Sequence, residues 1–415
     1  MVSLKIQKRS VLVLILTLIL FSGNTIIIGY VTPLLYLVGF FSFIWGDRKQ
    51  IRSNKYTSRI IGIYLAWLIF LIINTVQSYD FSASKSMIPV FIIGGVFCLF
   101  SWKETTVYTY INMIRFFCLF FAVSILVEVI APNFILAVSN VIAPGRSSVI
   151  QNEISRGIYS GLTGEKAKAA YAMVIGICAE LSFFVFNDKK LNKSNYFLAT
   201  MLTSKRMLCV IILLEIGVAL KLFDFKGKSV KIILGGAIAL VAVFVITITI
   251  PQTSNIVDRF MEASEDTSAG GRLMFWNYCI EMFKDKPIIG YGINTFNKAF
   301  SDNVGYVYQG SRWNMYAHSM YYELLGETGI VGIVLFGFFM LYSLVYSLRL
   351  FKNSCLSNVW KGLLWFSISL QILFIVYGYS GNVLYDKAQL FTYLSSISML
   401  IAVSYHAFNE TEILI

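Results

Sequence analysis

Long apolar runs separated by short polar connections make up most of the chain. A bilayer core of roughly 30 Å needs about 20 apolar residues in a helix, so runs of this length predict transmembrane helices. Backbone groups in lipid must be satisfied internally, which favours a bundle of α-helices. The pattern therefore predicts an all-α integral membrane protein with about twelve transmembrane helices. The predicted spans are roughly 10–28, 30–46, 59–77, 87–101, 107–130, 167–186, 195–203, 207–222, 232–250, 319–348, 360–380 and 387–407.

The orientation follows from the basic residues between these runs. Run 195–203 is short and counts as a separate span only if residues 203–206 form a turn. With that turn and both termini in the cytoplasm, every short inside loop carries Lys or Arg, as the positive-inside rule requires. Without it, the basic loops of the last third would lie outside. We therefore keep the turn and the twelve-span count.

One long polar segment, residues 251–318, interrupts the apolar pattern. We expect it to form a large outer (periplasmic) loop with short helices before the tenth span. A second outer segment, 131–166, contains two prolines and several glycines. Neither segment resembles an independent domain, so residues 1–415 are predicted to form a single polytopic membrane domain.

The amino-acid composition supports a membrane protein and argues against nucleic acid as a binding partner. The chain is 57% hydrophobic and 13% charged, far from the composition of soluble proteins. Its formal net charge of +12 would suggest a nucleic-acid partner in a soluble protein. Here the basic residues flank the spans, so we expect membrane lipids and no nucleic acid as partners. The six cysteines form no CxxC motif or Cys/His cluster, so neither a zinc site nor a disulfide framework is expected.

Two arginines stand at the starts of predicted helices. Arg206 follows Lys205 at the outer end of a span. It either snorkels to the interface or clamps an anion, because its planar guanidinium matches two phosphate oxygens. Arg272 follows two glycines at the start of a predicted amphipathic helix that ends near Lys286, with Thr267 or Ser268 as cap. A cation in the first turn opposes the helix dipole, whereas the free N–H groups there attract anions, so this position favours phosphate binding.

His318 is one of two histidines and stands at the outer N-terminus of the tenth predicted span. The positive end of a helix favours neutral imidazole, the form that accepts a proton. A lone interfacial histidine can equally be structural. The two arginines on the same side favour the functional alternative for His318. His406 lacks such neighbours and is expected to be structural.

Three further patterns are open to a structural interpretation. Gly290 and Gly292 lack the strand and third glycine of a dinucleotide fingerprint, so they predict a tight turn. Glu327 lies one helical turn after Glu323 and is a candidate partner for an arginine. Gly326, Gly329 and Gly332 share a spacing that permits close helix contact. Charges within spans mark either a functional site or a buried polar network; these are Arg115, Glu128, Glu180 and Glu215.

The order of these motifs resembles the O-antigen ligase/polymerase superfamily. The resemblance covers roughly residues 160–335 and rests on Thr203–Arg206 at a helix junction, Gly270-Gly271-Arg272 with a following Trp, Gly290-x-Gly292-x-Asn294-x-Phe296, and His318 followed by Glu327, Gly329 and Gly332. The segment Gly164–Tyr171, with Lys166 and Lys168, also resembles the family pattern. Ser319 departs from it, since the family usually has Asn after the histidine.

The resemblance implies a glycosyltransferase of the bacterial inner membrane, with its active site facing the periplasm. Arg206 and Arg272 would bind the diphosphate of an undecaprenyl-diphosphate-linked glycan, and His318 would activate the acceptor hydroxyl, with inversion and without metal or another cofactor. The arginines and the neutral imidazole suit these roles. The candidate substrate-binding residues are Lys205, Lys168, Gly290, Gly292, Asn294, Tyr322 and Glu327.

The predicted activity is polymerisation of lipid-linked oligosaccharide repeat units into O-antigen or another surface polysaccharide. The alternative activity is that of a ligase, which passes finished glycan to lipid A-core and shares the same motifs. The acceptor is accordingly either a repeat unit or lipid A-core. A chain-length regulator protein is a further expected partner. A transporter or flippase would instead spread its charges along a path through the membrane. A structural or receptor protein would keep Arg206, Arg272 and His318 apart.

Overall fold

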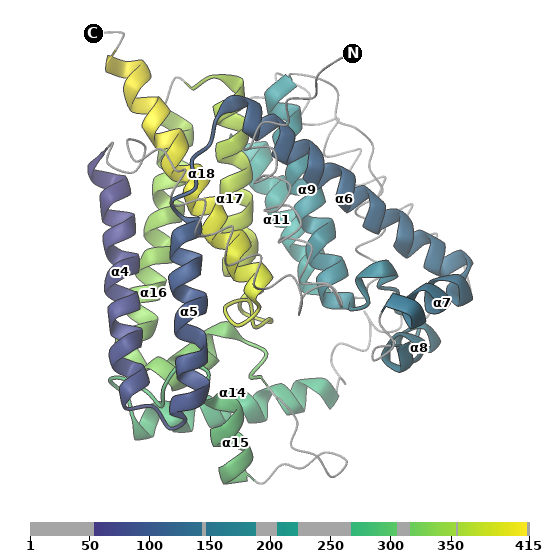
Figure 1. Ribbon diagram of the computed structural model, residues 1–415, viewed down its shortest axis with the longest axis vertical. Coiled ribbons are helices and arrows are strands. Elements are labelled where there is room, and N and C mark those ends of the chain that lie inside the picture. The colour runs from purple at the N-terminus through teal and green to yellow at the C-terminus, as the bar shows by residue number, and fades with distance from the viewer. Residues whose placement is uncertain are drawn as a thin grey trace. The chain divides into compact units, whose positions relative to one another are not determined.

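The computed structural model describes residues 54–142, 147–187, 206–222, 267–304, 316–353 and 356–412 (Figure 1). These residues form helices and no strand. The predicted spans 10–28, 30–46, 195–203 and 232–250 lie outside the described ranges, as do Lys205 and residues 251–266 and 305–315 of the predicted outer loop. The chain divides into two compact units, Met1–Leu34 with Thr105–Asp266 and Leu35–Glu104 with Thr267–Ile415. We call them the first and the second unit and describe each by itself.

The second unit is a bundle of apolar helices with two amphipathic helices at one end (Figure 1). The bundle helices are α4 (Lys55–Val76), α5 (Phe81–Phe97), α16 (Met320–Asn353), α17 (Asn358–Tyr377) and α18 (Lys387–Glu412). Helices α14 (Thr267–Asp285) and α15 (Phe296–Val304) pack against α16. In the core, the Trp67 ring of α4 lies 4.5 Å from Phe336 of α16 and 4.9 Å from Phe91 of α5, between ring centroids. Such aromatic packing joins three helices that are distant in sequence.

The first unit contains α6 (Glu104–Ile130), α7 (Pro132–Ile142), α8 (Ser147–Ser155), the short 3-10 turn η2 (Gly161–Thr163), α9 (Lys166–Asn187) and α11 (Arg206–Leu222). Helix α9 packs against α11, and α7 packs against α8. Within α6, the Nε of Arg115 lies 2.8 Å from Oε1 of Glu180 in α9, and both side chains are largely buried. The guanidinium also lies over the ring of Phe183. The sequence left open whether Arg115 and Glu180 mark a functional site or a buried polar network. Their contacts favour the buried polar network.

Five described helices are long and apolar enough to cross a membrane: α4, α6, α16, α17 and α18. Helix α5 is apolar but shorter. It runs from Phe81 to Phe97, so it begins before the expected span 87–101 and ends four residues before that span does. The all-α multi-pass membrane class is therefore supported by the described residues. The count of twelve spans and the position of the outer loop stay predictions.

Helix α16 is broken at Gly329, whose φ of 62° and ψ of −164° are not helical. The sequence predicted one uninterrupted span over 319–348, and this part of the prediction is wrong. A Cβ at Gly329 would lie 2.5 Å from the carbonyl carbon of Ile288, so the chain passes too closely there for any side chain. Residues 287–292 lie against the break and pair with the backbone groups that it frees. Ile330 N–H donates to the Pro287 carbonyl at 2.8 Å, and Gly292 N–H donates to the Glu327 carbonyl at 2.7 Å.

Candidate functional site

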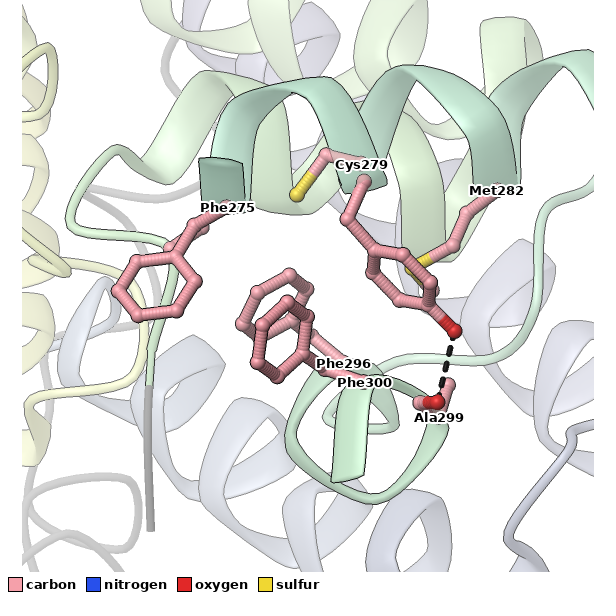
Figure 2. Close-up of a cluster of buried hydrophobic side chains, with 8 residues drawn as sticks. Phe275, Cys279, Met282, Phe296, Ala299 and Phe300 are labelled. Atoms are coloured by element: carbon pink, nitrogen blue, oxygen red, sulfur yellow. Dashed lines mark hydrogen bonds between the residues drawn. The ribbon is translucent and has the colours of Figure 1, made fainter. Parts of the chain in front are cut away.

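Helix α14 is held in place by a hydrophobic cluster beneath it. Phe275, Tyr278, Cys279 and Met282 point from α14 toward Phe296, Ala299 and Phe300 of α15, and the cluster also includes Ala317 (Figure 2). The Tyr278 hydroxyl donates to the Ala299 carbonyl at 2.7 Å. Because the apolar positions of α14 recur every three or four residues, one face of the helix is buried in this cluster. The cluster thereby brings α14 next to the segment that carries His318.

His318 is exposed, although both of its chain neighbours, Ala317 and Ser319, are fully buried. Its φ is 54°, in the left-handed region that residues other than glycine adopt uncommonly. Its imidazole lies 6.4 Å from the Phe275 ring of α14, between centroids. Strained backbone at an exposed histidine is a feature of functional sites, since the surrounding structure must impose it.

Backbone hydrogen bonds fix the chain on both sides of His318. The Ala317 N–H donates to Oε2 of Glu323 at 3.0 Å, and the Ala317 carbonyl accepts from Nε1 of Trp276 at 2.9 Å. On the other side, the Met320 N–H donates to the Gly378 carbonyl at 2.8 Å. The imidazole therefore projects from a segment whose backbone has little freedom to move.

Arg272 lies on α14 one helical turn before Phe275 and Trp276, the two residues that contact the His318 segment. Residues three and four apart share a helix face, so Arg272 lies on the same face of α14 as Phe275 and Trp276. The helix begins at Thr267 and not near residue 270, so the prediction that Arg272 occupies the first turn is wrong. Gly270 and Gly271 are accommodated within the helix instead of marking its start. The free N–H groups that attract anions therefore belong to the first turn, which precedes Arg272. They do not support phosphate binding at Arg272 itself.

Tyr322 packs beside the same segment. Its ring stacks on Trp276 with a centroid distance of 4.7 Å and an interplanar angle of 11°. Tyr379, two residues after the end of α17, has its ring 5.7 Å from the Trp276 ring and is half exposed. Arg272, His318, Tyr322 and these aromatic rings are therefore gathered at one end of the second unit.

Gly290, Gly292 and Asn294 form the predicted tight turn, with φ values of 70°, 110° and 63°. A Cβ at Gly290 would lie 2.3 Å from the backbone of Glu327, and one at Gly292 would lie 2.2 Å from Ser78. Glycine is required at both positions by close approach as well as by conformation. These contacts give the two glycines a structural role, and substrate binding by this segment stays a prediction.

Glu327 is fully buried, and its carboxylate holds the same segment. It accepts the N–H groups of Asn294 at 2.6 Å and Phe296 at 2.8 Å, together with the hydroxyl of Tyr385. Burial and the neighbouring carboxylate of Glu327 raise the pKa of Tyr385, so the phenol stays protonated and remains a donor. The expected arginine partner is thus replaced by backbone N–H groups and a tyrosine.

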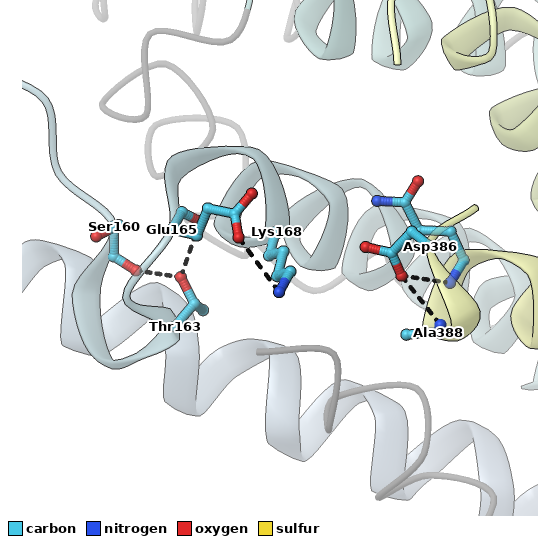
Figure 3. A network of polar contacts seen from close by, with 7 residues as sticks. Ser160, Thr163, Glu165, Lys168, Asp386 and Ala388 are labelled. Carbon is cyan, nitrogen blue, oxygen red and sulfur yellow. Dashed lines mark hydrogen bonds and ion pairs between the residues drawn. The ribbon is translucent and has the colours of Figure 1, made fainter. Parts of the chain in front are cut away.

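The remaining candidates belong to the first unit. Arg206 is the first residue of α11, as its predicted place at the start of a helix requires. Lys168 lies in the first turn of α9, and its Nζ is 3.2 Å from Oε2 of Glu165 (Figure 3). Ahead of α9, the buried carboxylate of Glu128 accepts the N–H groups of Ser160 and Gly161 at 2.7 Å each. A buried glutamate therefore anchors the turn before Lys168, much as Glu327 anchors the turn at Asn294.

Several residues of the site escaped the sequence analysis. Asn74 of α4 is fully buried; its amide donates to the Ile289 carbonyl at 2.6 Å and accepts from the Ile293 N–H at 2.9 Å. A lone amide near the end of an apolar run was the available signal. Trp276 and Glu323 belong to patterns visible in the sequence, but no sequence signature indicates that both contact Ala317. Among the described residues, no group of three or more His, Cys, Asp or Glu side chains could hold a metal ion.

Comparison with known proteins agrees with the motif order. The model of a protein family described as O-antigen ligase matches residues 196–337. This range includes Arg206, Arg272 and His318, together with the turn at Asn294 and the break at Gly329. No curated protein matches the chain. Across residues 196–337 the chain is thus similar to O-antigen ligases, and its resemblance to the O-antigen ligase/polymerase superfamily is confirmed.

Proposed function

We propose that the protein polymerises undecaprenyl-diphosphate-linked oligosaccharide repeat units on the periplasmic side of the bacterial inner membrane. The observation that carries the proposal is the exposed imidazole of His318. It projects from a strained and tightly held backbone that contacts the middle of α14, the helix that also carries Arg272. The family match spans both residues and Arg206. Members of this family are glycosyltransferase-like enzymes, which fits a base beside anion-binding groups.

In the proposed reaction, His318 accepts the proton of an acceptor hydroxyl as its oxygen attacks the anomeric carbon of the donor glycan. The bond from that carbon to the diphosphate oxygen breaks, and its electron pair leaves with undecaprenyl diphosphate. Attack opposite the leaving group inverts the anomeric centre. Arg272 binds the diphosphate and stabilises the negative charge that develops on it. The family resemblance assigns an anion-binding role to Arg206 as well.

The aromatic rings around His318 suit a carbohydrate substrate. Trp276, Tyr322 and Tyr379 lie next to one another, and Tyr379 is half exposed. Flat apolar ring faces pack well against the apolar face of a sugar ring, while hydroxyl groups at the rim remain solvated. Tyr322 is therefore proposed to contribute to glycan binding through this stack.

The test is gel display of surface polysaccharide from a deletion strain that is complemented with wild type or with Arg206→Ala, Arg272→Ala or His318→Ala. His406→Ala is the matched control, since the chain has two histidines and the ring of His406 stacks on Trp360 at 4.0 Å. Membrane levels of each variant are checked by immunoblot.

Polymerase activity predicts that the three site variants keep a single-repeat band and lose long chains, while His406→Ala gives the normal ladder. Loss of every glycan-bearing band with accumulation of lipid-linked polymer would indicate the ligase alternative. Normal ladders from all three site variants would overturn the proposed site.

A further inference from the structure

The left-handed conformation of His318 needs an explanation in the residues around it. A side chain with a Cβ avoids a φ of 54°, so the free segment would relax away from it. The conformation persists only when neighbouring contacts impose it. Ala317, immediately before the histidine, receives two side-chain contacts, one on its N–H and one on its carbonyl.

Glu323 supplies the first contact. Its side chain is 1% exposed, and Oε2 accepts the Ala317 N–H at 3.0 Å. Glu323 lies in the first turn of α16, where an acidic residue is favoured by the helix dipole. The dipole explains an acid at this position but not why its carboxylate is buried and reaches back to Ala317.

Trp276 supplies the second contact from a different helix. Its Nε1–H donates to the Ala317 carbonyl at 2.9 Å, and its ring is fixed by stacking on Tyr322. The two contacts come from α14 and α16, so they fix Ala317 relative to both helices. The helix that carries Arg272 is thereby tied to the residue that precedes His318.

We infer that Glu323 and Trp276 are positioning residues of His318, forming a clamp on Ala317 that holds the imidazole in its left-handed backbone setting. The inference rests on the proposed function, because it assigns the clamp to the histidine that acts as base. Neither residue touches the reacting atoms. Releasing either contact lets the His318 backbone relax and moves the imidazole from the acceptor hydroxyl.

Three substitutions isolate the clamp. Trp276→Phe removes the N–H donor and keeps a ring to stack on Tyr322. Glu323→Ala removes the acceptor, whereas Glu323→Gln keeps an oxygen acceptor of similar shape. Trp102→Phe is the matched control, since the Nε1–H of that buried tryptophan donates to Ser398 Oγ at 2.8 Å elsewhere in the same unit.

The measurement is kcat and KM of the purified full-length protein with lipid-linked repeat units. We expect Trp276→Phe and Glu323→Ala to lower kcat by about ten- to a hundredfold with KM within about twofold, because a small misplacement of a base is costly. Glu323→Gln should recover most of kcat, and Trp102→Phe should keep the wild-type value. In a His318→Ala background, Trp276→Phe should cause no further loss, since a clamp without its histidine has nothing to position.

Two results separate failure of the clamp from failure of the proposed function. Wild-type kcat in both Trp276→Phe and Glu323→Ala, while His318→Ala retains only a small residual kcat, would overturn the clamp alone. An equal further loss in the His318→Ala background would also overturn it, because the effect would then be on the fold. Wild-type activity of His318→Ala would instead overturn the proposed function and the clamp with it.

Discussion

The backbone N–H of Asn294 lies 2.6 Å from Oε2 of Glu327, and this contact repeats a relationship found at His318. Asn294 and His318 are the described non-glycine residues with positive φ. Asn294 donates to Glu327, and Ala317, directly before His318, donates to Glu323. Both acids are buried on α16, one helical turn apart. A single stretch of helix therefore holds two strained turns.

The first prediction concerns Glu327. Glu327→Ala leaves two backbone N–H groups and the Tyr385 hydroxyl without their acceptor. Each unsatisfied buried donor costs about 1–3 kcal/mol, so we expect a large fall in the free energy of unfolding. Glu327→Gln keeps one carbonyl acceptor, so its free energy of unfolding should fall less than that of Glu327→Ala. Thermal unfolding in detergent, followed by tryptophan fluorescence, measures the difference; equal midpoints for the two variants would contradict it.

The second prediction concerns the break in α16. Gly329→Ala places a Cβ about 2.5 Å from the Ile288 backbone at a positive φ. We expect poor insertion or rapid degradation, because neither backbone can move away without losing its hydrogen bonds. Gly337→Ala is the control on the same helix, where an added Cβ meets nothing within 4 Å. That variant should match the wild type or gain up to about 1 kcal/mol. Immunoblots of membrane fractions and unfolding midpoints test both.

The third prediction concerns the ion pair between Arg115 and Glu180. Arg115→Ala leaves a largely buried carboxylate without its cation, at a cost of about 3–5 kcal/mol. We expect the double substitution Arg115→Met with Glu180→Leu to be less destabilising than either single change, since it removes both charges and keeps apolar volume. A double-mutant cycle on unfolding midpoints measures the coupling. Additive effects would show that the pair contributes no interaction energy.

The fourth prediction concerns pH. Asp80 caps α5: its carboxylate accepts the Ala83 N–H at 3.1 Å and pairs with Lys298 at 3.4 Å. The Ala83 contact, with a smaller effect of Lys298, lowers the pKa of Asp80. A lowered pKa contributes stability above the ordinary value of about 4 that is lost as pH falls through the folded-state value. The unfolding midpoint of wild type should therefore fall more steeply below about pH 4 than that of Asp80→Asn, which keeps the cap without titrating. Parallel pH curves would contradict this assignment.

The apolar pattern was sufficient to locate the helices, because burial in lipid imposes long runs that a sequence displays directly. The expected span 107–130 coincides with α6, and 387–407 lies within α18. The end of α14 near Lys286 also agrees. The break at Gly329 was not predicted, since glycine at a three-residue spacing equally suits close helix packing. Only the close approach of the Ile288 backbone to Gly329, which the structure shows, distinguishes a helix break from close helix packing.

The sequence was sufficient to select candidate residues of the site, but not to predict which groups those residues contact. Charge and position selected Arg272 and His318, which lie at the same end of the second unit. The partners of Glu327 were not predictable, because they are backbone N–H groups whose availability depends on the turn at Asn294. Asn74 was missed for the same reason: its partners lie more than 200 residues away along the chain.

The interruption at Gly329 also sets where the bilayer can begin. The apolar stretch Met320–Lys352 would be about 50 Å long as one straight helix, well beyond the roughly 30 Å hydrocarbon thickness. The part after the break measures about 35 Å and is long enough to cross unaided. Glu323 and Glu327 precede the break, so the crossing segment carries neither carboxylate into the hydrocarbon. Hydrophobic matching is thus compatible with two buried acids at the head of a membrane helix.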